Sequence, residues 1–155
     1  MLNAAAPIGP RGVGGGDGDG GDGDDCDDEI VVERALEYIE EEEYDDAIVE
    51  YDRLLEDDPD NLLYLRDRAA TNLLAGTYER AIDDYDHLLS IKEEPDADLY
   101  YNRGCAHMAA SRLQEAISDF DKSIEMNETW SLAYNNRGVT YARLGEYQKA
   151  IADFT

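Results

Sequence analysis

The side chains best suited to catalysis in this sequence are those of His87, Cys105 and His107. A cysteine nucleophile needs a base within hydrogen-bond reach. His87 comes late in one helical pattern and should be exposed, whereas His107 takes the place that Tyr141 holds in a later copy and should be packed between helices. The many carboxylates are those of an acidic surface, and no two of them stand out as a catalytic pair in a pocket. We therefore expect no active site and no enzymatic activity.

Metal sites need a defined spacing of ligands, which this chain does not show. Its two cysteines give neither a disulfide framework nor a cluster with histidine. The stretch that begins at Asp17 fails as an EF-hand loop, since Gly21 and Asp22 stand where an acid and a glycine are required. Residues 20–25 partly resemble a calcium-binding nonapeptide, but one unit cannot build a β-helix. We expect no metal and no cofactor.

The elements that carry these residues follow a fixed period. Ala-Ile pairs recur at spacings of 34, 35 and 34 residues: Ala47-Ile48, Ala81-Ile82, Ala116-Ile117 and Ala150-Ile151. Three residues before and four residues after each Ala stand large apolar or aromatic side chains: Tyr44 and Tyr51, Tyr78 and Tyr85, Leu113 and Phe120, Tyr147 and Phe154. Offsets of three and four place these side chains on one helical face. Such a period predicts stacked helical repeats, which present a surface to a partner.

Another helical pattern lies upstream of each Ala-Ile pair. Its middle position always holds a small residue, which lets a neighbouring helix approach closely: Ala35, Ala69, Gly104 and Gly138. The two patterns are separated by Gly76-Thr77, Ser111-Arg112 and Gly145-Glu146, where glycine can adopt the left-handed conformation that ends a helix. The first copy has Glu42-Glu43 instead, so we expect its turn to be less favourable.

These positions resemble the tetratricopeptide repeat family, whose period is 34 residues and whose pattern sets small and aromatic residues at fixed offsets. The match covers residues 28–155 and is strongest in the fourth copy, which reads Tyr134-Asn135-Asn136-Arg137-Gly138. The resemblance implies an all-α fold, a right-handed α-α superhelix of helical hairpins. Its repeats are expected at 28–61, 62–96, 97–130 and, in part, 131–155. The Gly- and Asp-rich acidic tail before them, residues 1–27, is expected to be disordered.

Charged residues recur with the same period. Each copy has an Arg just before its small residue and an acid just before its second-helix aromatic: Arg34 with Glu50, Arg68 with Asp84, Arg103 with Asp119, and Arg137 with Asp153. The constant separation predicts a structural ion pair, within a hairpin or between neighbouring hairpins, because bidentate Arg–carboxylate contacts fix register. The alternative is a set of solvated surface charges, each worth about 0–1 kcal/mol.

In the tetratricopeptide repeat family, the first helices of successive hairpins line a concave groove that binds extended peptides or helices. Carried onto this chain, the resemblance implies a peptide-binding groove formed by Leu63, Arg66, Tyr101, Cys105, Met108, Leu132, Asn135 and Val139. This set is more apolar than a solvated helix face, and an exposed apolar patch marks an interaction site. The alternative is a narrow groove in which some of these side chains belong to the core.

One subgroup of the family clamps the terminal carboxylate of heat-shock chaperones with Lys, Asn and Arg side chains. The matching positions here hold Val32, Leu36, Asp67, Asp98 and Asn102 in one register, and Arg66, Ala70, Asn102, Leu132 and Asn136 in the other. Neither set supplies the required cations. We therefore expect a protein of another type.

The net charge of −25, of which −14 lies in residues 28–61, restricts the partners. It argues against nucleic acid, which binds cationic surfaces that displace its counterions. The sequence has no run of 18 apolar residues, which a membrane helix would need, and its N-terminus has no secretory signal. We therefore expect a cytoplasmic protein with no membrane partner. The acidity favours a basic partner or adaptation to high salt, and both stay open.

The sequence thus predicts a scaffold that binds a protein or peptide segment in the groove of its repeats. Two alternatives remain: an acidic chaperone or decoy for a basic protein, and a regulatory domain of a larger enzyme. The last helical pattern is shorter than its earlier copies by roughly two turns. Either the chain is a fragment of a longer protein or its end docks on another surface; we favour a fragment, in which Ile151 and Phe154 should be partly exposed.

Overall fold

The computed structural model describes residues 25–155, with side chains from residue 28 onward. Within this range every regular element is an α-helix: α1 (Asp25–Glu40), α2 (Tyr44–Asp57), α3 (Leu62–Leu74), α4 (Tyr78–Ile91), α5 (Ala97–Ala109), α6 (Leu113–Met126), α7 (Ser131–Arg143) and α8 (Tyr147–Phe154). The expected all-α fold is therefore confirmed. Residues 1–24 of the tail expected to be disordered lie outside the described residues, and α1 already begins at Asp25.

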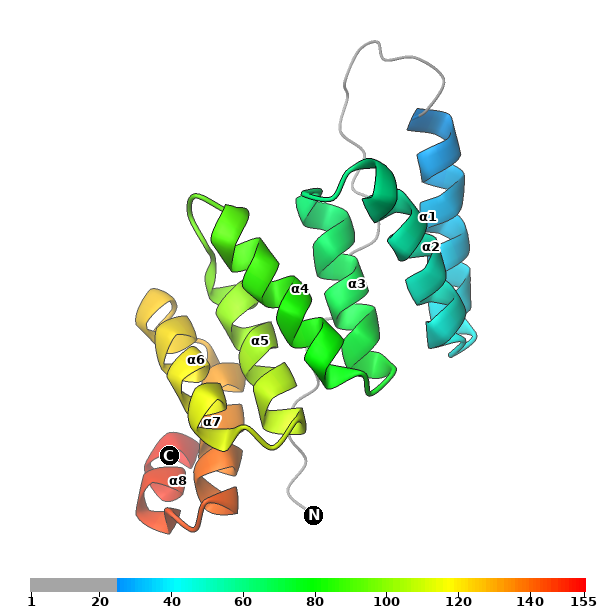
Figure 1. The fold of residues 1–155 in the computed structure, drawn as a ribbon. Coiled ribbons are helices and arrows are strands. Elements are labelled where there is room, and N and C mark those ends of the chain that lie inside the picture. The colour runs from blue at the N-terminus through cyan, green and yellow to red at the C-terminus, as the bar shows by residue number, and fades with distance from the viewer. Residues whose placement is uncertain (1–24) are drawn as a thin grey trace.

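The helices form hairpins that stack side by side. Helix α1 contacts α2, α3 contacts α4, α5 contacts α6 and α7 contacts α8, while α2 with α3, α4 with α5 and α6 with α7 join one hairpin to the next. Figure 1 shows the resulting row, which runs from α1 at one end to α8 at the other. Each hairpin thus buries its apolar sides mainly on its neighbours in the chain, which is the architecture of a solenoid.

The close approach of the two helices in a hairpin depends on the small residue of the first helix. A Cβ atom added at Gly104 would lie 2.8 Å from the ring of Phe120, and one added at Gly138 would lie 2.7 Å from the ring of Phe154. A methyl group would overlap the ring at these distances. The periodic small and aromatic residues therefore report one contact that recurs along the chain.

The turns within the hairpins share one backbone conformation. In each turn one residue has a positive φ angle: Glu42 at 62°, Gly76 at 78°, Ser111 at 63° and Gly145 at 80°. The next residue donates its backbone N–H to the carbonyl five positions earlier, as Thr77 does to Asn72 at 2.9 Å. Glycine adopts this conformation without strain, but other residues lose about 1 kcal/mol or more. Glu42 and Ser111 therefore strain the first and third turns.

The core continues from hairpin to hairpin but is open at α8. Ile117 and Phe120 of α6 are 8% and 0% exposed because α7 packs beside them. Their counterparts in α8, Ile151 and Phe154, are 56% and 47% exposed. The apolar side that α6 buries against a following first helix is therefore accessible on α8.

Candidate protein-interaction surface

Four of the eight residues predicted to line the groove are accessible: Leu63, Arg66, Leu132 and Asn135. Leu63 and Leu132 are 36% and 37% exposed, and they occupy the same repeat position in α3 and α7. Arg66 and Asn135 follow them by three residues and are half-buried. We call the side of the first helices that these four residues mark the first-helix face.

The other four predicted groove residues lie in the core: Tyr101, Cys105, Met108 and Val139. The ring of Tyr101 is fully buried and stacks on Trp130 with 4.9 Å between the ring centroids. Burial raises the pKa of the Cys105 thiol to about 12, so the thiol stays protonated and unreactive near neutral pH. These four match the narrow-groove alternative. Ligand contact stays a prediction for all eight residues, of which four are accessible in this structure.

A polar residue occupies the same interior position of α3, α5 and α7. Asp67, Asn102 and Asn136 follow one another at intervals of 35 and 34 residues, and they are 3%, 3% and 0% exposed. The Asn136 side chain donates to the Tyr101 hydroxyl at 3.1 Å and to Cys105 Sγ at 3.3 Å. Both partners lie on α5, so this position faces the preceding first helix across the seam between two hairpins.

Asp67 meets a different neighbour at the seam between α1 and α3. The α1 residues that correspond to the two partners of Asn136 are Val32 and Leu36, which are apolar. Oδ1 of Asp67 is buried and has no hydrogen-bond partner among the described residues. Desolvation raises the pKa of Asp67 to about 6, although Arg66 acts in the opposite direction. Sequence reasoning treated Asp67 only as a misfit in the clamp. The missed signal was an acid where the next two hairpins carry Asn.

The Arg–carboxylate contacts lie inside the hairpins. Arg68 donates Nε to Asp84 Oδ2 at 3.0 Å and Nη2 to Oδ1 at 2.6 Å. The same bidentate contact recurs at 2.6–2.9 Å in the next two hairpins: Arg103 with Asp119, and Arg137 with Asp153. The side chain of Asp119 is only 3% exposed, and its hydrogen bonds raise the pKa of the Arg103 guanidinium above its usual value. These contacts pair carboxylates that are 3–8% exposed with arginine side chains that are 18–21% exposed.

A second acid, which sequence reasoning missed, connects each of these arginines to the preceding hairpin. Nη1 of the arginine donates to that acid at 2.6–2.7 Å: Arg68 to Asp52, Arg103 to Asp86, and Arg137 to Asp121. In α2, α4 and α6 the second acid stands two residues after the acid that pairs within the hairpin, so these three helices read acid-aromatic-acid. One guanidinium therefore links the second helices of two successive hairpins. We call this series of contacts the arginine ladder.

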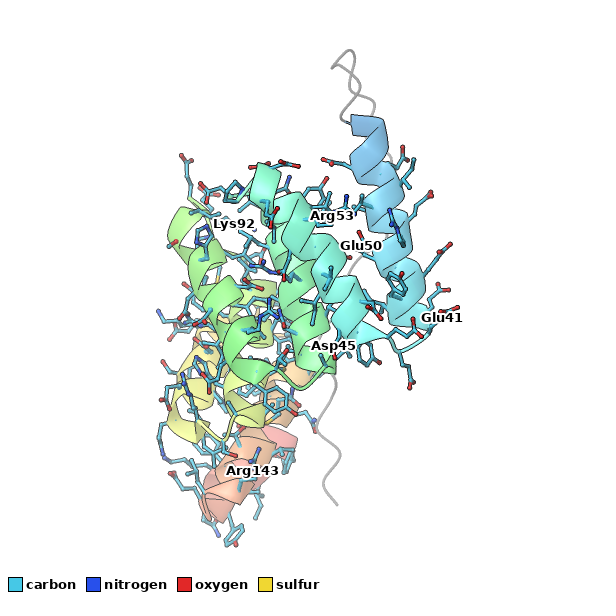
Figure 2. All side chains as sticks on the ribbon, turned by 45° about the vertical axis from the view of Figure 1, so that its right-hand side comes forward. Glu41, Asp45, Glu50, Arg53, Lys92 and Arg143 are labelled. Carbon is cyan, nitrogen blue, oxygen red and sulfur yellow. The ribbon has the colours of Figure 1, made fainter. Side chains whose placement is uncertain are left out.

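Arg34 of the first hairpin makes a weaker contact. Its Nη1 lies 3.5 Å from Glu50 Oε1, and its side chain is 42% exposed. Glu50 also accepts a hydrogen bond from Arg53 at 3.3 Å, and Figure 2 shows these two side chains on α2. No second acid reaches Arg34 among the described residues. The first hairpin thus lacks the three-point contact that the later arginines make.

Among the described residues, neither histidine is hydrogen-bonded to Cys105, whose Sγ accepts from Asn136. His107 is buried on α5, where burial lowers its pKa, and its Nε2 lies 3.7 Å from Asp119 Oδ2. His87 is exposed on α4 and lies 2.7 Å from Asp60. In the described part of the chain, no cluster of His, Cys, Asp and Glu could hold a metal ion. None of the helices described is both long and apolar enough to traverse a bilayer.

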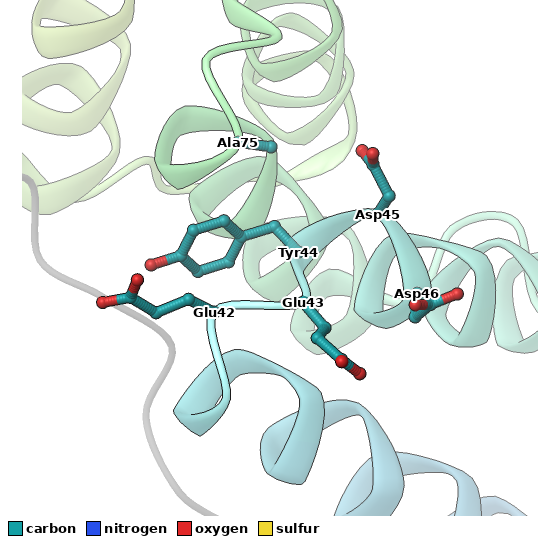
Figure 3. Close-up of a pocket in the computed structure, with 6 residues that line it drawn as sticks. All are labelled: Glu42, Glu43, Tyr44, Asp45, Asp46 and Ala75. Atoms are coloured by element: carbon teal, nitrogen blue, oxygen red, sulfur yellow. The ribbon is translucent and has the colours of Figure 1, made fainter.

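An acidic pocket of about 250 Å³ lies at the turn between α1 and α2. It is lined by Glu42, Glu43, Tyr44, Asp45, Asp46 and Ala75. Figure 3 shows the carboxylates diverging from the Tyr44 ring instead of meeting at one point. A bound cation needs converging oxygen ligands. The pocket therefore offers negative potential but no coordination site.

Two sequence patterns of the tetratricopeptide repeat family match the chain, one over residues 32–98 and the other over 97–129 and 131–155. Heat shock protein STI1 of Saccharomyces cerevisiae is 26% identical over 80 residues, which are 52% of this chain and 14% of that protein. Photosystem I assembly protein Ycf3 of Rippkaea orientalis is 32% identical over 73 residues, 46% of this chain and 42% of that protein. The chain thus spans less than half the length of either relative.

Several solved structures share the fold. The crystal structure of MamA has a TM-score of 0.71 and 27% identity, covering 77% of this chain and 70% of that one. The first TPR of Spaghetti (RPAP3), bound to the HSP90 peptide SRMEEVD, has a TM-score of 0.69 and 23% identity, covering 79% and 96%. YrrB, a TPR protein with an unusual peptide-binding site, has a TM-score of 0.65 and 21% identity, covering 80% and 63%.

The fold, the period and these matches agree with one another. The hairpins stack in the order that a solenoid requires, and the matched patterns extend from α1 to α8. Proteins built from such repeats are generally interaction scaffolds without catalytic activity. The chain belongs to the tetratricopeptide repeat family.

Proposed function

We propose that this protein binds a protein or peptide segment along its first-helix face and performs no catalysis. The observation that carries the proposal is the pair of exposed leucines, Leu63 and Leu132, at one repeat position of α3 and α7. Leu62 and Leu74 of α3 are also exposed, at 44% and 42%. What distinguishes Leu63 and Leu132 is that they repeat at one position of the first helices. Arg66 and Asn135, beside these leucines, supply polar groups that can orient a ligand.

Two solved structures with this fold support a peptide as the ligand. The RPAP3 domain is bound to an HSP90 peptide, and YrrB has a peptide-binding site. Their identities of 23% and 21% indicate a common fold, and the ligand of this chain is not carried over from them. The proposal therefore rests on the residues of the first-helix face itself.

The proposed ligand is not the terminal carboxylate of a heat-shock chaperone. A carboxylate clamp places cations and neutral amides around the terminal carboxylate, but Asp67 and Asp98 occupy two of these positions here. Like charges brought together at a binding site oppose association. We also propose that the protein has no nucleic-acid partner, because its net charge is −25. We further propose that it is cytoplasmic and has no membrane partner.

An array of short random-sequence peptides tests the proposal. We expect the protein to bind a subset of the peptides, and a Leu63→Ala/Leu132→Ala variant to lose most of that binding. The matched control is Val49→Ala/Met126→Ala, which removes side chains that are 55% and 52% exposed on second helices. Equal losses in both variants, or no peptide bound by the unaltered protein, would refute the proposal.

A second candidate function is an acidic chaperone or decoy for a basic protein. It is favoured by the charge of −14 in residues 28–61 and by the acidic pocket at the α1–α2 turn. Salt distinguishes the two functions, because the screening length falls from about 10 Å at 0.1 M to about 3 Å at 1 M. Binding that depends on Leu63 and Leu132 should weaken only in part in 1 M salt, whereas binding driven by the acidic first hairpin alone should be abolished.

A further inference from the structure

The seam between α1 and α3 contains a buried acceptor without a donor. Asp67 is 3% exposed, and its Oδ1 accepts no hydrogen bond from the described residues. The Tyr51 hydroxyl, buried on α2, also has no partner. Thr71 donates to the backbone carbonyl of Asp67 at 2.8 Å and not to Oδ1. The described residues thus donate no hydrogen bond to this oxygen, although the Tyr51 hydroxyl lies close enough to interact with Asp67 electrostatically.

The corresponding position of α7 shows what the seam lacks. Asn136 carries its own donor and finds acceptors in Tyr101 and Cys105 on α5. A carboxylate only accepts hydrogen bonds, and the α1 positions that correspond to the partners of Asn136 hold the apolar residues Val32 and Leu36. A buried acceptor left unpaired is costly, so a donor brought by a ligand would remove that penalty on binding.

The charge of the surrounding first helices selects the kind of donor. Glu29 and Glu33 on α1 are exposed, and Asp98 on α5 is half-buried. Both neighbouring first helices thus carry acids, while Arg66 is the adjacent cation on α3. A positively charged ligand complements such an acidic surface. Charged donors also form the strongest hydrogen bonds to carboxylates.

We propose that the ligand of the first-helix face is a basic peptide segment, and that one Lys or Arg side chain of it donates to Asp67. This inference rests on the proposed function and narrows its ligand class. Leu63 lies one helical turn before Asp67 on the same helix, so an apolar residue and a cation of one peptide can engage both. Asp67 acts here as a residue that determines specificity.

Matched peptide series test this inference. Peptides that bind the protein are resynthesised with each Lys or Arg replaced by norleucine or by Glu, and they are titrated against the unaltered protein and Asp67→Asn. We expect one replacement to weaken binding about tenfold or more in the unaltered protein and to have little effect in Asp67→Asn. Asn stands at this position in α5 and α7, so the variant should fold.

The control variant is Asp83→Asn, which removes an equal charge from an exposed position on α4. It should keep the preference for Lys and Arg. If Asp67→Asn keeps the preference as well, or if the unaltered protein binds peptides regardless of charge, the inference is wrong although peptide binding stands. If no peptide binds at all, the proposed function fails and the inference fails with it.

Discussion

The first two hairpins and the last two follow one pattern, but they treat the same buried positions differently. In the third hairpin the second-helix ring is Phe120, and the seam residue of the fourth, Asn136, has its hydrogen bonds. In the first two hairpins the ring belongs to Tyr51 or Tyr85, whose hydroxyls are buried without partners among the described residues, and the seam residue is Asp67. Unpaired polar groups of this kind lower stability. The third hairpin has unpaired buried groups as well, His107 Nδ1 and Ser123 Oγ, so the two halves differ in where these groups lie: in the part of the chain that the structure describes, only the N-terminal half has one at the seam position.

The largest expected difference between the two halves lies in the arginine ladder. Arg103→Ala should lower the free energy of unfolding by about 3–5 kcal/mol, because it leaves the buried Asp119 carboxylate without its bidentate partner. Arg34→Ala should change it by only about 0–1 kcal/mol, because Arg34 is 42% exposed and makes one long contact. Urea denaturation at neutral pH measures both.

A double-mutant cycle serves as the control for the ladder. Combining Arg103→Ala with Asp119→Asn should recover part of the loss, since the uncompensated charge is then gone. Equal losses in the free energy of unfolding for Arg34→Ala and Arg103→Ala would contradict the predicted difference between the hairpins.

The next effect concerns the pH dependence at Asp67. Its pKa is raised to about 6 in the folded state from 3.8, so the folded protein binds this proton more tightly than the unfolded chain does. The free energy of unfolding contributed by Asp67 therefore falls as pH rises from about 4 to 6. Asp67→Asn should stabilise the protein by about 2–3 kcal/mol above pH 7 and by little below pH 4.

Thermal or urea unfolding of both proteins between pH 4 and 8 gives the measurement. Asn102→Asp provides the opposite change at the equivalent position of α5, and it should destabilise the protein above pH 7. A pH-independent difference between Asp67→Asn and the unaltered protein would mean that the carboxyl does not titrate as described.

A smaller effect is expected at the tyrosines. Tyr85→Phe should stabilise the protein by about 1 kcal/mol, because it removes a buried hydroxyl that has no hydrogen-bond partner. Tyr101→Phe should destabilise it by about 1 kcal/mol, because the Asn136 amide loses an acceptor. Chemical denaturation of the two single variants tests the sign of each change, and identical signs would contradict the assignment.

The smallest effect lies in the turns. Ser111→Gly should stabilise the protein by about 0.4–1 kcal/mol, because Ser111 holds a φ of 63° that glycine adopts without strain. Gly76→Ala makes the reverse change at a φ of 78° and should destabilise it by a similar amount. Differential scanning calorimetry reads both as shifts in Tm. A stabilising Gly76→Ala would contradict the turn assignment.

Features that repeat with the period were predictable from the sequence. The contact of Gly104 with Phe120 recurs as Ala or Gly with Tyr or Phe in every hairpin, so spacing alone marks it. The first acid of the arginine ladder has the same property, because the contact between Arg103 and Asp119 closes within one hairpin.

Features that break the period were not predictable. Tyr101 belongs to the core because Trp130 stacks on it. Trp130 immediately precedes α7, and the equivalent positions before α3 and α5 hold the capping residues Asn61 and Asp96 instead. The second acid of the ladder does repeat with the period, but its arginine lies in the following hairpin, so this pairing depends on how hairpins stack. Asp67 breaks the pattern of Asn at the equivalent positions of α5 and α7, and the lack of a donor to its Oδ1 among the described residues emerges only in the packed structure.

The central claim is that a ligand binds the first-helix face. An NMR titration of isotope-labelled protein with the tightest-binding Lys-containing peptide tests it most directly. We predict chemical-shift changes in the backbone amides around Leu63, Arg66, Leu132 and Asn135, with α2 and α4 largely unaffected. Changes confined to the second helices, or to the acidic turn around Tyr44, would contradict the claim.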